Sequence, residues 1–176
     1  MKTVTIIGKA PSGASCPFEG EVWGINETPP LYPGKRFDKI FSVDPLKPEG
    51  VALLKSFGST IVSVQSYADE PYPLAEVKAK FGQTYFMASL AYAIAYALLK
   101  GYEKIILYGC DHKMRSEYLR GKGSVEYWIG RAHGMGVEVW IQKESDLLKN
   151  IQTFSFQVIT PANEKVVTPA RVFNLR

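Results

Sequence analysis

Short apolar runs alternate with longer segments of helical period along this chain. The short runs are rich in β-branched and aromatic residues, which favour strands, whereas apolar positions spaced three and four apart favour helices. This alternation of strands and helices predicts an α/β domain with a mostly parallel sheet. The predicted strands are residues 3–7, 21–26, 37–43, 59–64, 104–109 and 137–142, the predicted helices are 48–57, 84–100 and 124–133, and Ser145 is expected to start a last short helix.

Two neighbouring segments are expected to form the middle of the domain. Residues 84–100 are Ala-rich and apolar nearly all round, and Gly101 follows them as a C-terminal cap. The strand "KIILYG", residues 104–109, is apolar enough to be buried on both faces and therefore central. Before them, the irregular residues 65–83 are interpreted either as a lid or binding segment, or as a plain connection with a short helix inside it.

From residue 151 the pattern changes to an alternation of polar and apolar residues around "TPANEK". This alternation predicts two strands joined by a turn. The domain organisation expected is therefore an α/β domain over residues 1–150 and a C-terminal β-hairpin arm over residues 151–176. Such an arm either binds a second copy of the chain, giving a homo-oligomer, or packs on an edge of its own domain.

Charge and cysteine content narrow the choice of partners and compartment. The 176 residues carry a net charge of +4, but Lys and Arg are scattered, which favours a small anionic ligand over a nucleic acid. The two cysteines, Cys16 and Cys110, are far apart in the sequence and lack the spacing of a metal site, as in a reduced cytoplasmic protein. The most apolar stretch, residues 87–99, is shorter than a bilayer-spanning helix, so we expect a cytoplasmic protein without a membrane partner.

The first predicted strand runs directly into "GKAPSG", residues 8–13. A tight turn with small residues and free backbone N–H groups suits a phosphate, although an ordinary turn has the same composition. The segment is neither a P-loop nor a GxGxxG fingerprint, since the required lysine spacing and the middle glycine are both absent. Its candidate phosphate-binding residues are Gly8, Lys9, Ala10, Pro11 and Ser12.

Polar residues also follow the other predicted strands. In a doubly wound sheet, ligands bind outside the carboxyl ends of the strands, where the strand order reverses. The candidates at such positions are Asn26, Asp44, Gly109, Asp111 and His112. Asn26 and Asp44 have an alternative role as turn caps. Asp44 and Asp111 are suitable ligands for a divalent cation, but two carboxylates are too few to predict a metal site.

Three blocks of the sequence resemble the bacterial sialyltransferases that act on lipooligosaccharide. The blocks are "IIGKAPSG", "VWGIN" and "SLAYAIAYALLKGYEKIILYGCD". Those enzymes begin with a strand and a GNGPS-like loop, and they place an asparagine at the end of the second strand. Later they carry a Ser-initiated apolar helix, a Gly-Tyr pair and a strand that ends in Gly-x-Asp. The chain also resembles uncharacterised Rossmann-like proteins of bacteriophages and prophages, through "EYWIGRAHGMGVEVWI" and "ESDLLK", and hydroxymethylpterin pyrophosphokinase-like proteins in architecture.

The resemblance implies a Rossmann-like three-layer sandwich that binds a nucleotide or nucleotide sugar of cytidine type. The backbone of residues 8–12 would then wrap the phosphates, Asn26 would contact the nucleotide, and Ser89, at the start of the long helix, would contact phosphate or ribose. No further cofactor is implied. The chain departs from the pattern at Lys9 and Ala10, which replace an asparagine and a glycine, and at Glu126, which lies where the sialyltransferases have a catalytic histidine.

Two hypotheses of function follow from these residues. The first is a group transferase that uses a nucleotide sugar, in which Glu126 or His112 takes a proton from the acceptor. The second is a non-catalytic phage accessory or assembly module with a degenerate nucleotide pocket.

Overall fold

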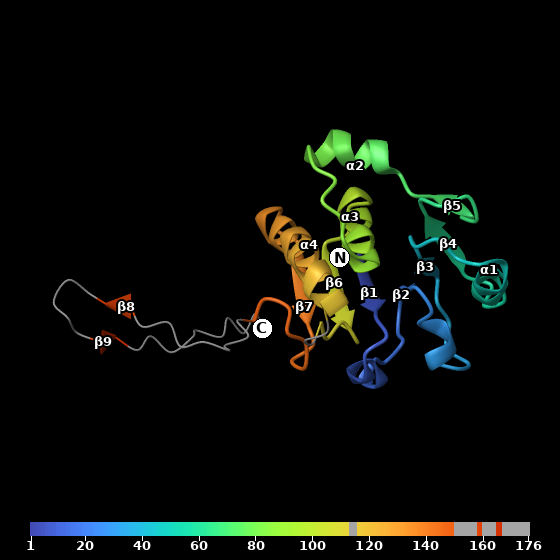
Figure 1. The fold of residues 1–176 in the computed structure, drawn as a ribbon, viewed down its shortest axis with the longest axis horizontal. Coiled ribbons are helices and arrows are strands. Elements are labelled where there is room, and N and C mark those ends of the chain that lie inside the picture. The colour runs from blue at the N-terminus through green and yellow to red at the C-terminus, as the bar shows by residue number, and fades with distance from the viewer. Residues whose placement is uncertain (113–115, 150–157, 160–164, 167–176) are drawn as a thin grey trace.

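A parallel β-sheet forms the centre of the molecule (Figure 1). The computed structural model describes residues 1–112, 116–149, 158–159 and 165–166. Within them, the central sheet has seven strands in the order β5-β4-β3-β2-β1-β6-β7, and all neighbours are parallel. The strand order reverses between β1 and β6, where a doubly wound sheet opens a ligand crevice. The strands are β1 (Thr3–Ile7), β2 (Val22–Ile25), β3 (Lys39–Phe41), β4 (Thr60–Ser63), β5 (Glu70–Pro71), β6 (Lys104–Tyr108) and β7 (Glu138–Ile141).

Helices cover the two faces of the sheet unequally. Figure 1 shows α3 (Ser89–Leu99) and α4 (Ser116–Gly134) side by side on one face, with α2 (Leu74–Phe81) packed against α3. The opposite face is covered by α1 (Pro48–Lys55), which packs Leu54 against Ile40 and Ile61, and by segments that include the 3₁₀ turns Pro11–Ser15 and Pro29–Leu31. The result is the three-layer α/β sandwich expected from the sequence.

The main core lies between the sheet and α3. Trp23 of β2 is completely buried, and its ring lies 5.1 Å from that of Phe41, 5.5 Å from that of Tyr96 and 5.1 Å from that of Tyr102. Tilted and edge-on pairs at these distances are the favourable arrangements of aromatic rings. Because Tyr96 belongs to α3, this cluster fixes the helix on the sheet.

Three expectations about the elements are wrong in detail. α3 begins at Ser89 rather than at residue 84, and α4 begins at Ser116 rather than at residue 124. No helix starts at Ser145, because this residue is buried in a turn and its hydroxyl donates to the carbonyl of Cys110 at 2.6 Å.

The expectation that β6 is buried on both faces is also wrong. β6 lies inside the sheet between β1 and β7, but its side chains alternate between full and partial burial. Ile105 and Leu107 face the helices, whereas Ile106 and Tyr108 on the other face are only half-buried. The 3₁₀ turn Pro11–Ser15 is in contact with β6.

The region 65–83 contains the short helix α2, as one interpretation predicted, together with the edge strand β5. In the C-terminal segment, β8 (Val158–Ile159) and β9 (Lys165–Val166) pair antiparallel, as in the predicted hairpin. The rest of residues 151–176 lies outside the described residues, so the boundary at 150 and the role of the arm stay predictions.

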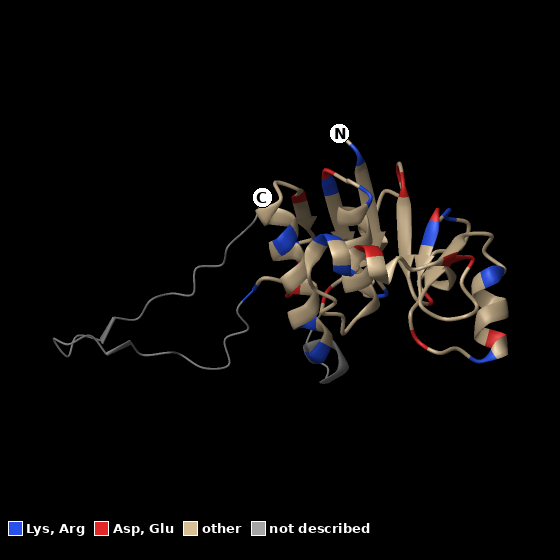
Figure 2. Cartoon of the chain, turned by 90° about the horizontal axis from the view of Figure 1, so that it is seen from above, with Lys and Arg blue, Asp and Glu red and all other residues tan. Residues whose placement is uncertain are grey.

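Charged side chains of both signs are interspersed over the described domain (Figure 2). Figure 2 shows no gathering of Lys and Arg into one basic face in that view. None of the helices in the described part of the chain is long and apolar enough to cross a bilayer.

Replacing Trp23 with alanine should remove the centre of the aromatic cluster. We expect the substitution to lower the free energy of unfolding by about 3–5 kcal/mol, because the cavity left under α3 adds to the lost apolar burial. Urea denaturation followed by circular dichroism measures the change. Trp140→Ala is the matched control, since Trp140 on the edge strand β7 is only half-buried, and an equal loss in both variants would contradict this description of the core.

Candidate functional site

The loops that follow β1 and β6 touch at the point where the strand order reverses. The Gly8 N–H donates to the Tyr108 carbonyl at 2.9 Å, and the Ala10 N–H donates to the Gly109 carbonyl at 3.0 Å. A Cβ on Gly8 would lie 2.4 Å from the Gly109 oxygen, and Gly109 has a left-handed φ of 61°. Both positions therefore require glycine, which accounts for the first glycine of "GKAPSG".

This contact limits what the loop can offer to an anion. The N–H groups of Gly8 and Ala10 are used within the protein, and Pro11 has none. Within the described residues, the N–H groups of Lys9 and Ser12 make no backbone hydrogen bond outside regular structure, so these two are the backbone donors that residues 8–12 can present.

Gln142 joins the same two loops from the end of β7. Its side chain is buried, its Nε2 donates to the Ser12 carbonyl and to Ser15 Oγ, both at 2.8 Å, and its Oε1 accepts from the Gly109 N–H at 3.2 Å. Gln142 is not among the site residues that the sequence predicts. Its position directly after a strand is the signal that could have found it, since the other candidates share that position.

Ser12 also contacts the loop after β6 through its side chain. Its hydroxyl donates to the Asp111 carboxylate, which is buried, and the Asp111 carbonyl accepts from the Asp146 N–H at 2.7 Å. His112 follows in the left-handed conformation with φ 48°. The structure therefore brings Ser12, Gly109, Asp111 and His112 to one end of the crevice.

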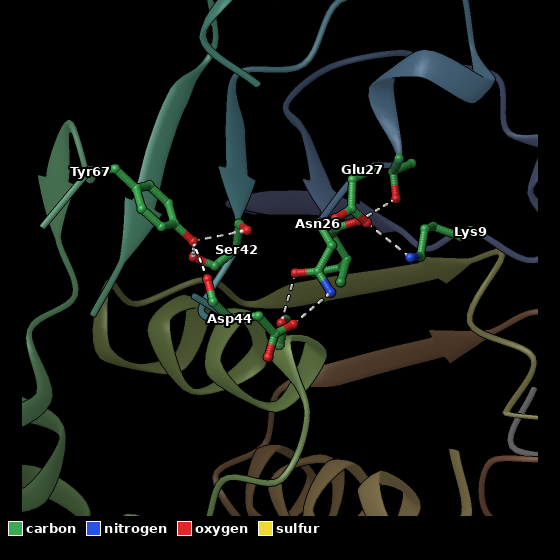
Figure 3. A network of polar contacts seen from close by, with 9 residues as sticks. Lys9, Asn26, Glu27, Ser42, Asp44 and Tyr67 are labelled. Atoms are coloured by element: carbon green, nitrogen blue, oxygen red, sulfur yellow. Dashed lines mark hydrogen bonds and ion pairs between the residues drawn. The ribbon is translucent and has the colours of Figure 1, made fainter. Parts of the chain in front are cut away.

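A second group of candidates meets at the ends of β2 and β3 (Figure 3). Asn26 has a left-handed φ of 51°, a conformation that asparagine tolerates better than most residues. Its Oδ1 accepts from Ser89 Oγ at 2.9 Å, and its Nδ2 lies 3.5 Å from Asp44 Oδ2. Ser89 is buried and is the first residue of α3, so the helix start is aimed at the end of β2.

An ion pair connects the two groups. Lys9 Nζ donates to Glu27 Oε2 at 3.0 Å, which bridges the loops after β1 and β2 (Figure 3). Burial raises the pKa of Glu27, but the hydrogen bond and the charge of Lys9 outweigh it, so the pKa lies below the ordinary value. Lys9 therefore has a carboxylate partner at the carboxyl end of β2.

Glu126 makes no hydrogen bond or ion pair to these residues in the described part of the chain. Its Oε1 accepts from the Leu148 N–H at 2.6 Å and lies 3.5 Å from Lys122 Nζ. It lines a groove of about 480 Å³ on the surface of α4 together with Tyr127, Arg131 and Met135, and none of the crevice residues lines that groove. A role of Glu126 as a base stays a prediction.

Neither cysteine has the environment of a nucleophile or metal ligand. Both are free thiols and buried, and burial raises the pKa of Cys110 to about 12. Such a thiol stays protonated and packs as a small apolar side chain. In the described ranges, no group of three or more His, Cys, Asp or Glu side chains is arranged to hold a metal ion.

Solved structures with a similar fold include sialyltransferases. The sialyltransferase CstII from Campylobacter jejuni, in complex with the substrate analogue cytidine-5′-monophosphate (CMP), has a TM-score of 0.54 and 16% identity over 80% of this chain and 79% of that one. Its complex with CMP-3FNeuAc gives 0.53 and 16%, covering 80% of each chain. A mutant of the α-2,3/8-sialyltransferase CstII gives 0.51 and 19%, covering 80% of this chain and 81% of that one.

At sequence identities of 16% to 19%, these similarities establish the fold alone. They confirm the Rossmann-like α/β sandwich, and they support at the level of fold the relation to sialyltransferases that the motifs predicted. No family model and no curated protein matches the sequence. The phage and pyrophosphokinase resemblances stay predictions.

Gln142→Leu should loosen the contact between the two loops. We expect a loss of about 1–3 kcal/mol in the free energy of unfolding, because the Ser12 carbonyl and the Gly109 N–H lose a buried partner. Chemical denaturation measures the loss, and faster hydrogen exchange of the Gly109 amide should accompany it. The control is Gln83→Leu, since the exposed Gln83 side chain forms a hydrogen bond only to the following N–H in the described chain, and equal effects would refute the bridging role.

Proposed function

We propose that this protein binds a nucleotide or nucleotide sugar of cytidine type in the crevice at the carboxyl ends of β1, β2, β3 and β6. The observation that carries the proposal is the start of α3. Ala88 at its N-cap gives no side-chain cap, and the Ser89 hydroxyl is turned to Asn26 instead. An uncapped start of an eleven-residue helix, with its positive dipole end, favours an anion at this point.

The loop after β1 supplies further donors on the same side of the crevice. The N–H groups of Lys9 and Ser12 and the ammonium group of Lys9 are available to a phosphate in this proposal. The sialyltransferase structures of similar fold were described in complex with CMP or a CMP sugar, which supports the cytidine nucleotide as the first ligand to test.

For catalysis, we propose transfer of the sugar from the nucleotide to an acceptor hydroxyl. The hydroxyl oxygen would form a bond to the anomeric carbon, the bond from that carbon to the phosphate oxygen would break, and the nucleotide would leave with the electron pair. His112 is better placed than Glu126 to take the hydroxyl proton, because it follows Asp111, which contacts Ser12. Donors at the start of α3 would stabilise the charge of the leaving phosphate.

A non-catalytic binding module is the second candidate, and the position of Glu126 favours it. The carboxylate at the position of the sialyltransferase base binds the Leu148 N–H and Lys122, which is a structural use. On either candidate we infer a cytoplasmic protein, and a phage or prophage origin rests on the sequence resemblance alone.

Titration calorimetry with CMP, uridine monophosphate and NAD tests the binding proposal. We expect CMP to bind, and Ser12→Ala and Asn26→Gly each to weaken it about tenfold or more, since each removes a polar side chain from the crevice. Glycine is chosen at position 26 because the left-handed φ of 51° would strain alanine. Gln83→Leu should bind as the original protein does, and absence of binding by folded protein to every nucleotide would refute the proposal.

Release of CMP from CMP-N-acetylneuraminic acid separates the two candidates. A transferase should hydrolyse this donor slowly to water, lose the reaction in His112→Ala and keep it in Glu126→Gln. Chromatography of the released CMP measures it. Loss in Glu126→Gln with unchanged stability would instead assign the base to Glu126, and no release by protein that binds CMP would favour the binding module.

A further inference from the structure

We propose that Asp44 selects a ribonucleotide by accepting hydrogen bonds from the 2′- and 3′-hydroxyls of ribose, and that Tyr67 holds Asp44 in position. This inference rests on the proposed function and adds two points to it. It gives the orientation of the nucleotide in the crevice, and it names the sugar that the site accepts.

Asp44 has acceptor capacity that the protein does not fill. The residue is exposed after β3, and within the described chain its carboxylate accepts one side-chain hydrogen bond, from the amide of Asn26 at 3.5 Å. Within residues 1–112 and 116–149 it takes part in no ion pair. A carboxylate accepts about four hydrogen bonds and donates none, so Asp44 suits a group with two donors, such as a pair of neighbouring hydroxyls.

The neighbouring charges set the direction of the ligand. Glu27 is paired with Lys9, whereas Asp44 takes part in no ion pair among the described residues, and both lie after the neighbouring strands β2 and β3 (Figure 3). A phosphate would be repelled there, whereas the helix start at Ser89 and the loop after β1 favour one. The 2′- and 3′-hydroxyls of a nucleoside 5′-phosphate lie on ring carbons away from the phosphate-bearing carbon. The phosphate therefore binds near Ser12 and Ser89, and the ribose extends towards Asp44.

Asn26 supports the Asp44 carboxylate, which holds the ribose. In dinucleotide-binding sheets a carboxylate near the end of the second strand holds the ribose hydroxyl. Here Asn26 occupies that strand end, and its Oδ1 already accepts from Ser89. The carboxylate comes from the next strand along the sheet, and the Asn26 amide lies beside it.

Tyr67 fixes the segment that carries Asp44. Its hydroxyl lies 3.0 Å from the Ser42 carbonyl and 2.6 Å from the Asp44 carbonyl, and it can donate a hydrogen bond to either of them (Figure 3). Gln65 Nε2 donates to the intervening Val43 carbonyl at 2.9 Å. Both residues come from the loop between β4 and β5, so a neighbouring loop holds residues 42–44 before a ligand arrives. Such preorganisation reduces the entropy lost on binding.

Calorimetric titration with CMP, 2′-deoxy-CMP and 3′-deoxy-CMP tests the inference. The original protein should bind CMP about ten- to hundredfold more tightly than either deoxy analogue, the ratio expected for a hydrogen bond to a charged acceptor. Asp44→Asn, which keeps the shape but loses the charge, should reduce this ratio to about threefold or less, mainly by weakening CMP. Glu76→Gln removes one negative charge from exposed α2 and should keep the full ratio.

Tyr67→Phe tests the positioning role. It should lower the ratio between CMP and 2′-deoxy-CMP, whereas a general loss of folded protein would weaken both ligands equally. Equal binding of CMP and its deoxy analogues by the original protein, or an unchanged ratio in Asp44→Asn, would overturn the inference and leave the proposed function standing. Absence of binding to every nucleotide would overturn both.

Discussion

The close approach of the backbone after β1 to the backbone after β6 is the constraint on which the rest of the site depends. Gly8 and Gly109 are in contact, and no larger residue fits at either position. Gly13 belongs to the same arrangement, because a Cβ there would lie 2.2 Å from the hydroxyl oxygen of Tyr32. With the two loops in contact, the buried amide of Gln142 can bond to both, and Ser12 can reach Asp111.

The aromatic core positions the second group of candidate residues, those at the ends of β2 and β3. Trp23 packs against Tyr96, so the position of α3 on the sheet is set by rings in its middle. The first residue of the helix, Ser89, then reaches Asn26 at the end of β2. The packing of the core thus determines where the Ser89 hydroxyl meets the Asn26 side chain. The left-handed backbone of Asn26 turns its amide towards that hydroxyl.

The sequence was sufficient for six of the seven strands and for the polar residues that follow them, because both depend on local patterns, whereas the two-residue edge strand β5 was missed. Apolar runs locate strands, and polar residues directly after them locate the strand ends. Periodicity alone placed the start of the long helix at residue 84, whereas the resemblance to sialyltransferases singled out Ser89, where the helix begins. The start of α4 was missed because "SEYLRGKG" is polar and contains two glycines, which weaken any helical pattern.

The partners of these residues could not be predicted, since they come from distant parts of the chain. Gln142 lies about 130 residues from Ser12, and Tyr67 reaches Asp44 from a loop that the sequence left open between two interpretations. The half-buried face of β6 likewise depends on which strands the helices cover. An apolar run alone does not determine this.

The ion pair between Lys9 and Glu27 has a consequence for the anions that this crevice can hold. An anion that takes the ammonium group of Lys9 must take it from Glu27, so its attraction competes with a charge already 3.0 Å away. Coulomb attraction grows with the charge of the competitor, and a phosphate dianion therefore displaces Glu27 more readily than chloride does. Because the side chains of Lys9 and Glu27 are 43% and 42% exposed, the pair is weak, and a phosphate can separate it at little cost in free energy.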